Sequence, residues 1–197
     1  MAKELANADQ TIFLWINGLA GIFGPIDLLA GLLAGDYFVP VGLSLTLVAM
    51  WFAGPDKGTR QRYQLGLIVA LTSMALSSLV VLIVNAQYFR PRPFETVDVT
   101  HLMYMPTDSS FPANAMAATF GMAAAVWGVN RKVGTALLVA AGIYGFARVM
   151  AGVHYPLDIV GGAAIGVVMA FFVFKLRDLL MPVLVAALRF ARIFCLA

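Results

Sequence analysis

The residues best suited to chemistry lie at the junction of two apolar segments. Arg148 lies six residues before His154, and Asp158 follows four residues after it. Side chains four apart across a helix start can share one face, so the carboxylate can approach the imidazole. Such a carboxylate fixes the histidine tautomer and stabilises its protonated form. The pattern predicts a histidine that attacks phosphorus and carries a phosphoryl group, although a structural polar pair bridging two helices would have the same spacing.

Two arginines follow an earlier apolar segment. Arg90 and Arg92 alternate with prolines, and this alternation cannot continue a helix. It would present both guanidinium groups on stiff, extended backbone. A guanidinium fork matches two phosphate oxygens at once. The segment therefore indicates phosphate binding, or alternatively anchoring at a membrane interface by snorkelling side chains.

A helix start follows at Asp108-Ser-Ser-Phe-Pro-Ala-Asn-Ala115. Aspartate or serine near the start and proline in the first turn are typical of helix N-termini. The free backbone N–H groups of such a start can bind an anion, with Asn114 as an additional side-chain donor. An ordinary capped helix would show the same pattern.

The elements that position these residues are expected to be membrane helices. The 197 residues are 61% hydrophobic and 12% charged, whereas soluble domains carry about 25% charge. We predict an all-α, polytopic membrane helical bundle forming one domain, 1–197, with about six transmembrane helices and an amphipathic tail at 179–197. The first span is weak because Gly24-Pro25 interrupts it, so the count is five or six. The expected spans are 11–33, 38–54, 64–87, 113–129, 133–151 and 156–174.

Basic residues outside the candidate site indicate the orientation. With six spans, ten of the thirteen lysines and arginines fall on one face, which the positive-inside rule makes cytoplasmic. Arg90, Arg92 and Arg148 fall on the opposite face with His101, His154 and Asp158. We therefore expect an active site that faces outward from a prokaryotic inner membrane, and no nucleic-acid partner.

Three segments resemble, in order and spacing, the signatures of the type 2 phosphatidic acid phosphatase superfamily. Arg148-x5-His154-x3-Asp158 resembles S-R-x5-H-x3-D, and Arg92-Pro93 resembles the end of K-x6-R-P. The segment 110–115, Ser-Phe-Pro-Ala-Asn-Ala, resembles S-F-P-S-G-H. The resemblance covers roughly residues 40–175.

The resemblance implies a helical membrane fold and hydrolysis of a lipid phosphate or diphosphate through a phosphohistidine, with no metal and no cofactor. His154 would be the nucleophile and Asp158 would orient it. Arg92 and Arg148 would hold the phosphate, with Arg90 and Asn114 as further candidates. The expected partners are the lipid substrate and membrane lipids.

Four positions depart from the signatures. Asn85 stands in place of lysine, Ala113 and Ala147 replace serines, and Ala115 replaces the histidine that usually serves as general acid. A positioned general acid is worth about 10²–10⁴-fold. When a lipid diphosphate is cleaved, the lipid monophosphate leaves as a stable anion and needs little protonation, so these changes favour a polyprenyl diphosphate over phosphatidic acid.

His101 could serve as a substitute acid if its loop folds over the site, or it could be a solvated loop histidine. Two alternatives to hydrolysis stay open. A catalytically impaired member could bind or translocate a phospholipid, and a phosphotransferase could pass the phosphoryl group to another lipid. A channel or transporter has little support, because no regular series of intramembrane charges and no inverted repeat is visible.

Overall fold

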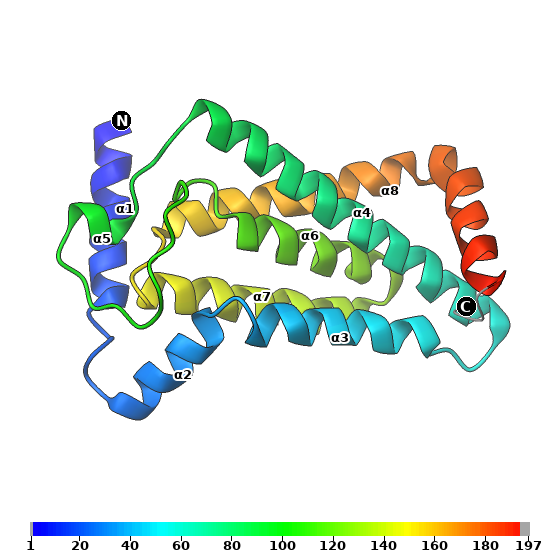
Figure 1. Ribbon diagram of the computed structural model, residues 1–197, viewed down its shortest axis with the longest axis horizontal. Coiled ribbons are helices and arrows are strands. Elements are labelled where there is room, and N and C mark those ends of the chain that lie inside the picture. Colours follow the sequence, from blue (N-terminus) through cyan, green and yellow to red (C-terminus); the bar gives the residue numbers. More distant parts are fainter. Residues whose placement is uncertain (1, 194–197) are drawn as a thin grey trace.

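The computed structural model describes residues 2–193, and every element in that range is a helix (Figure 1). The prediction of an all-α bundle is confirmed. Cys195 and the end of the predicted tail lie outside the described residues. The helices are α1 (Ala2–Asn17), α2 (Gly24–Ala34), α3 (Phe38–Phe52), α4 (Lys57–Gln87), α5 (Pro93–Thr96), α6 (Asn114–Val129), α7 (Arg131–Met150) and α8 (Pro156–Ile193).

Three helices are long and apolar enough to cross a membrane: α4, α7 and the Pro156–Leu176 part of α8. The pair α2 and α3, bent by 52° at a short break, passes the same test together and brings the count to four. The 16-residue α6 is apolar but shorter. The predicted count of about six is therefore not confirmed. The expected span 11–33 is divided, because α1 ends at Asn17 and Pro25 occupies the first turn of α2, where its missing N–H costs nothing.

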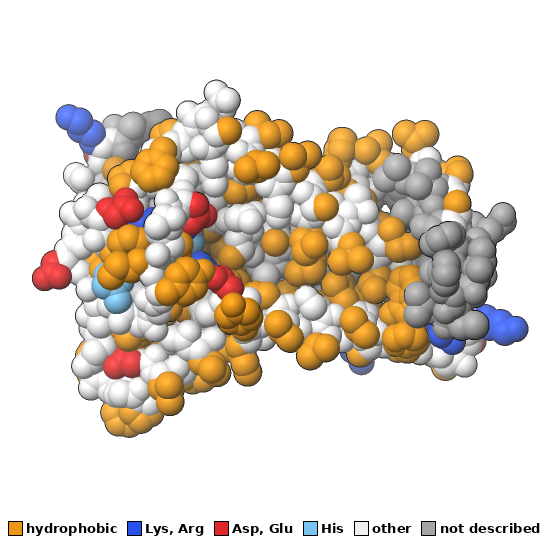
Figure 2. All heavy atoms as spheres, viewed as in Figure 1, with side chains coloured by type: hydrophobic (Ala, Val, Ile, Leu, Met, Phe, Trp, Pro, Cys, Tyr) orange, Lys and Arg blue, Asp and Glu red, His pale blue; other side chains and the backbone are white. Residues whose placement is uncertain are grey.

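The outer surface of the bundle is apolar. Figure 2 shows hydrophobic side chains along the middle of the visible face, whereas acidic side chains gather mainly at the end where α1 and α5 lie, and basic side chains appear at both ends. Leu71, Leu82 and Phe171 are among the large exposed hydrophobic residues. Lipid accepts such surfaces on all sides of a helix. The protein is an integral membrane protein.

Two glycines let α8 pack directly on the backbone of α6. A Cβ atom on Gly162 would lie 2.3 Å from the carbonyl oxygen of Ala113, and one on Gly166 would lie 2.5 Å from that of Ala117. Small residues permit this close approach in membrane proteins, where packing rather than water exclusion drives association. We call this contact the glycine seam. It joins the start of α6 to the start of α8, where the candidate site residues lie.

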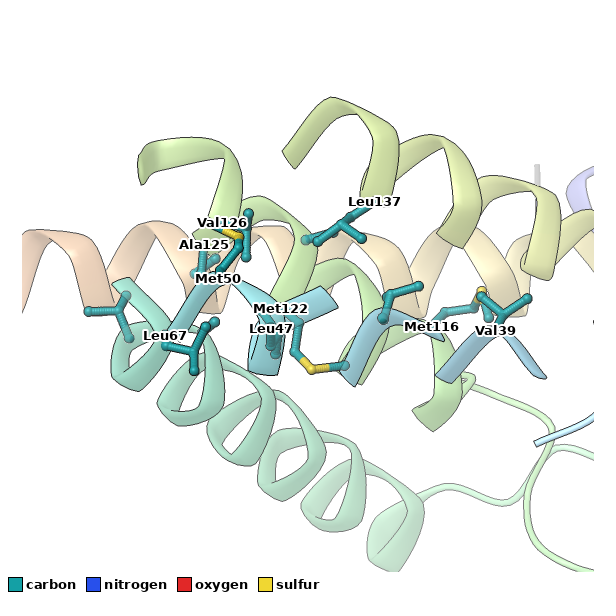
Figure 3. Close-up of a cluster of buried hydrophobic side chains, with 14 of the residues drawn as sticks. Val39, Leu47, Met50, Leu67, Met116, Met122, Ala125, Val126 and Leu137 are labelled. Carbon is teal, nitrogen blue, oxygen red and sulfur yellow. The ribbon is translucent and has the colours of Figure 1, made fainter. Parts of the chain in front are cut away.

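A buried apolar cluster fills the centre of the bundle (Figure 3). Its members come from α3, α4, α6, α7 and α8, so five helices converge on it. Close packing of this cluster fixes the helices that carry the site. The labelled members are Val39, Leu47, Met50, Leu67, Met116, Met122, Ala125, Val126 and Leu137.

The two ends of the bundle differ in chemistry. The basic residues Lys57 and Arg131 begin α4 and α7, at the end opposite to α1 and α5 (Figure 1). At the other end, α7 turns into α8 through Gly152, whose φ of +83° favours glycine. α8 continues to Ile193 past the internal Pro182 and changes direction in this last part (Figure 1). Contact of the segment 179–197 with the membrane surface stays a prediction.

Candidate active site

His154 is buried between α7 and α8, with 3% of its surface exposed. Its Nδ1 lies 3.1 Å from the carbonyl oxygen of Ser110. A carbonyl only accepts, so Nδ1 carries the hydrogen and Nε2 keeps its lone pair. Nε2 in turn lies 3.2 Å from Nη1 of Arg92. The backbone contact therefore presents an unprotonated, nucleophilic nitrogen to a guanidinium group.

The surroundings of His154 keep the ring neutral. Burial lowers its pKa to about 4, and the positive charges of Arg148 and Arg92 act in the same direction. Asp158 acts in the opposite direction without overcoming them. A neutral imidazole has the free lone pair that attack on phosphorus requires. The ring is thus in its reactive form at neutral pH.

Asp158 lies close to His154, but Ser110 lies between them and contacts both residues. The carboxylate Oδ2 lies 3.8 Å from Nδ1 of His154, beyond hydrogen-bond distance. The hydroxyl of Ser110 donates to the same Oδ2, as does the N–H of Tyr155 at 2.7 Å. The latter bond is half of a capping box at the start of α8. Ser110 therefore touches both predicted catalytic residues, through its hydroxyl and its carbonyl.

Arg92 is buried and held by several acceptors. Its Nη1 donates to the carbonyl of Val153 at 2.9 Å, and its Nε donates to the carbonyl of Asp108 at 2.9 Å. Its Nη2 pairs with the Asp108 carboxylate at 2.7 Å, and that side chain is 65% exposed. The backbone acceptors fix the guanidinium beside His154, whereas the exposed carboxylate can leave.

Arg148, like Arg92, is buried and paired with a partly exposed carboxylate. Its Nη1 donates to the Tyr144 hydroxyl and to the Asp36 carboxylate, each at 2.7 Å. The side chain of Asp36 is 40% exposed. The Nε of Arg148 is buried and has no hydrogen-bond partner. Such a donor is costly to leave unsatisfied, and a phosphate oxygen could accept from it.

The structure also locates the three remaining predicted residues. Arg90 donates to two carboxylates, Asp158 and Asp9, each at 2.6 Å, so its fork is occupied. Asn114 is exposed at the start of α6. His101 packs edge-on against Phe94 with ring centroids 5.4 Å apart. The direct phosphate-binding roles predicted for Arg90 and Asn114, and the acid role of His101, remain predictions.

The expected backbone anion site is partly used within the protein. The N–H of Ala113 donates to the carbonyl of Asp158 at 3.1 Å. This bond ties the start of α6 to α8 and leaves one N–H fewer for a phosphate. Within the part of the chain that the structure describes, no three His, Cys, Asp or Glu side chains group as they would around a metal ion.

A pocket of about 450 Å³ lies beside Asp108, between α4 and the start of α6. Its α4 wall is largely apolar, and its other end is polar. Asn85 and Asn114 both line it, so two residues singled out in the sequence come together. The lining residues are Ser78, Val81, Leu82, Asn85, Ala86, Phe89, Asp108, Ser109 and Asn114.

Sequence reasoning missed three aspartates that hold the arginines. Asp9 pairs with Arg90, Asp36 with Arg148, and Asp108 with Arg92. Asp9 and Asp36 lie far from the signatures in sequence. For Asp36 a carboxylate between two apolar segments was the available signal, because such residues need a partner in a membrane protein. Asp9 lies in a polar stretch that gave no such signal.

The chain is similar to several known proteins. Undecaprenyl-diphosphatase BcrC of Bacillus subtilis is 29% identical over 171 residues, which cover 87% of this chain and 85% of that protein. Bacitracin transport permease protein BcrC of Bacillus licheniformis is 32% identical over 133 residues, 67% of this chain and 63% of that protein. The crystal structure of Aquifex aeolicus LpxE is similar in fold, with a TM-score of 0.66 and 24% identity, covering 84% of this chain and 94% of that one.

The PAP2 superfamily profile matches residues 66–182. That range includes Arg92, Ser110, Arg148, His154 and Asp158. Because the match covers more than half of the chain and contains the residues that build the site, the chain belongs to the PAP2 superfamily and is a membrane lipid phosphatase of that type.

Proposed function

We propose that the protein removes the terminal phosphate from a polyprenyl diphosphate through a phosphohistidine at His154, without a metal ion. The observation that carries the proposal is the pair of contacts on this ring. Ser110 holds the hydrogen on Nδ1, and Nη1 of Arg92 lies 3.2 Å from Nε2. A phosphoryl group held by that guanidinium would lie next to the nucleophilic lone pair.

The reaction would take two displacements. First, Nε2 forms a bond to the terminal phosphorus as the bridging P–O bond breaks, and the bonding electrons leave with the lipid monophosphate. Then water attacks the phosphorus, the N–P bond breaks, its electrons return to Nε2, and inorganic phosphate departs. Arg92 and Arg148 stabilise the charge on the transferring oxygens, and Asp158 stabilises the positive ring of the intermediate.

The absence of a histidine at position 115 is compatible with this substrate class. A lipid monophosphate is a stable leaving anion, so the general acid that Ala115 lacks contributes little to its departure. An alkoxide leaving group, as from phosphatidic acid, would need that proton. His101 remains a candidate substitute acid, and a His101→Ala variant with undiminished turnover would exclude it.

The pocket beside Asp108 supports a lipid substrate. Its apolar α4 wall suits an isoprenoid chain, and its polar end lies one ion pair away from Arg92. Asn85, which lines this pocket, has a buried Oδ1 without a hydrogen-bond partner. We propose that the chain of the lipid lies along α4 and that its phosphates replace Asp108 and Asp36 on the two arginines.

The proposed site faces outward from a prokaryotic inner membrane. The support is the separation of charge: α4 and α7 begin with Lys57 and Arg131 at the end of the bundle opposite to the site. Basic ends of membrane helices stay in the cytoplasm. Protease protection of a tag on either end of the chain in right-side-out vesicles would test the orientation.

The activity is tested by phosphate release from farnesyl diphosphate in detergent micelles containing EDTA. The parent, His154→Ala and Ala115→His are compared, with phosphatidic acid as the second substrate. We expect turnover of the diphosphate by the parent, no turnover by His154→Ala, and a gain on phosphatidic acid in Ala115→His. Acid-labile ³²P on the parent but not on His154→Ala would support the intermediate.

Ala115 also favours a second candidate, a catalytically impaired protein that binds or moves a phospholipid. Silence of the parent on every lipid phosphate, with lipid binding that survives His154→Ala, would support this candidate and refute the first. Labelled phosphate that appears on a second lipid rather than in solution would instead identify a phosphotransferase.

A further inference from the structure

The first helix places a buried carboxylate at the site end of the bundle. Asp9 lies on α1, outside the range that matches the family profile, and its side chain is 0% exposed. α1 runs across one end of the bundle, beside α5 (Figure 1). Burying a charge is costly unless it is paired and hydrogen-bonded. The location of Asp9 therefore needs a specific partner.

Both oxygens of Asp9 are used. Oδ2 accepts from Nη2 of Arg90 at 2.6 Å, and Oδ1 accepts from the N–H of Leu157 at 2.9 Å. The other arm of Arg90 donates to Oδ1 of Asp158 at 2.6 Å. Asp9 thus holds Arg90 and the first turn of α8 together.

Aromatic rings restrict the same guanidinium. Its carbon lies 4.3 Å from the centroid of the Tyr155 ring, and Phe13 of α1 packs edge-on against that ring at 5.2 Å. Burial alone would lower the pKa of Arg90, but the two carboxylates raise it. Arg90 is therefore a fixed cation shared between Asp9 and Asp158.

We propose that Asp9 is a positioning residue of the active site, acting through Arg90 on Asp158 and so on His154. The proposal rests on the phosphohistidine mechanism above. With Asp9 charged, Arg90 divides its two arms between two carboxylates. If Asp9 loses its charge, Asp158 is the one carboxylate in the described part of the chain that still attracts the Arg90 guanidinium, and the ion pair between Arg90 and Asp158 becomes stronger. Asp158 then has less negative charge to stabilise the positive ring of His154, and its bond to Ser110 is weakened.

The expected effect is on the chemical step. The hydrogen bonds and ion pairs of Asp9 do not include Arg92, Arg148 or His154. Removing the Asp9 carboxylate is therefore expected to leave phosphate binding by the two arginines unchanged. Asp9→Asn keeps an oxygen for the Leu157 N–H but removes the charge that faces Arg90. We expect kcat on farnesyl diphosphate to fall about tenfold or more, the effect of losing one charge-assisted contact. KM is expected to stay within about twofold.

Asn17 provides the matched control on the same helix. Its side chain donates to the carbonyls of Thr100 and Met150, each at 2.9 Å, and accepts from the N–H of Thr100 at 3.1 Å. It anchors α1 without touching Arg90. Asn17→Ala is therefore expected to lower the melting temperature and to leave kcat unchanged below that temperature. A kcat loss equal to that of Asp9→Asn would mean that α1 docking alone matters, and would overturn the proposal.

A double-mutant cycle with Arg90→Gln tests the route of the effect. If Asp9 acts through Arg90, the double variant loses no more kcat than Arg90→Gln alone. Fully additive losses, or a kcat of Asp9→Asn equal to that of the parent, would overturn the proposal. A parent that releases no phosphate would refute the proposed function and this inference with it. An active parent with an unimpaired Asp9→Asn would refute the inference alone.

Discussion

Lowering the pH from about 7 to about 4 is expected to destabilise the folded protein through His154. Burial, reinforced by the charges of Arg148 and Arg92, lowers the pKa of this ring to about 4, whereas an exposed imidazole titrates near about 6.5. Between these values the unfolded chain binds more protons than the folded one. Stability therefore falls as the pH falls through this window. The difference corresponds to about 3 kcal/mol at full protonation of the unfolded chain.

The assay is reversible unfolding by SDS in mixed micelles, followed by tryptophan fluorescence at several pH values. His154→Gln is neutral throughout, so the parent is expected to lose about 3 kcal/mol relative to it between about pH 7 and about pH 4. His101→Gln removes the other histidine of the chain and leaves His154 as its single imidazole. ¹⁵N NMR of the ring in that variant reports the midpoint directly.

Two results would refute this reasoning. One is a stability difference between the parent and His154→Gln that does not change with pH. The other is an imidazole midpoint at or above the ordinary value for histidine. Either would mean that the ring is solvated or that Asp158 outweighs the two arginines, so its neutral form would not be enforced by burial.

Three further predictions follow from individual contacts. Ser110→Ala removes a hydroxyl donor to Asp158 worth about 1.5–3 kcal/mol, so kcat on farnesyl diphosphate is expected to fall about ten- to a hundredfold, and the melting temperature is expected to fall too because the bond is buried in the folded protein. Gly166→Val forces apart α6 and α8, where even a Cβ would lie 2.5 Å from a carbonyl oxygen, and is expected to lower the melting temperature sharply; Gly142→Val, with nothing within 4 Å, is its control. Asn130→Ala removes the N-cap of α7 and is expected to cost about 1 kcal/mol in SDS unfolding without changing kcat.

The class of fold and the core of the site could be predicted because they depend on local patterns. Apolar segments in a chain with little charge require helices in lipid. The spacing of His154 and Asp158 across a helix start predicted that they lie close together, and Nδ1 of His154 is 3.8 Å from Oδ2 of Asp158. Even here the contact between His154 and Asp158 differs from the expectation, because a serine hydroxyl and carbonyl lie between them. Spacing predicts proximity but not which group occupies the shared hydrogen bond.

The remainder depends on contacts between segments far apart in sequence. Asp9 and Asp36 lie more than 50 residues before Arg90 and Arg148, and no local pattern predicts which cation each carboxylate meets. The predicted number of spans is not confirmed for a related reason. Hydropathy recognises apolar composition, but it does not predict the 52° bend between α2 and α3, which pass the length test only as a pair.

The glycine seam has a mechanical consequence for an enzyme that handles lipids. Ser110 and Ala113 precede α6, and Asp158 lies in the first turn of α8, so backbone contact between these helices makes the nucleophile and its supports one stiff unit. Asp36 and Asp108, which occupy the two arginines, lie instead on a bend and on a loop. A headgroup that replaces these carboxylates would displace only the segments that carry Asp36 and Asp108, and the orientation of the His154 ring would be preserved. In the proposed mechanism, the segments that can move would lie where the headgroup enters, and the closely packed helix starts would hold His154 in place for its attack on phosphorus.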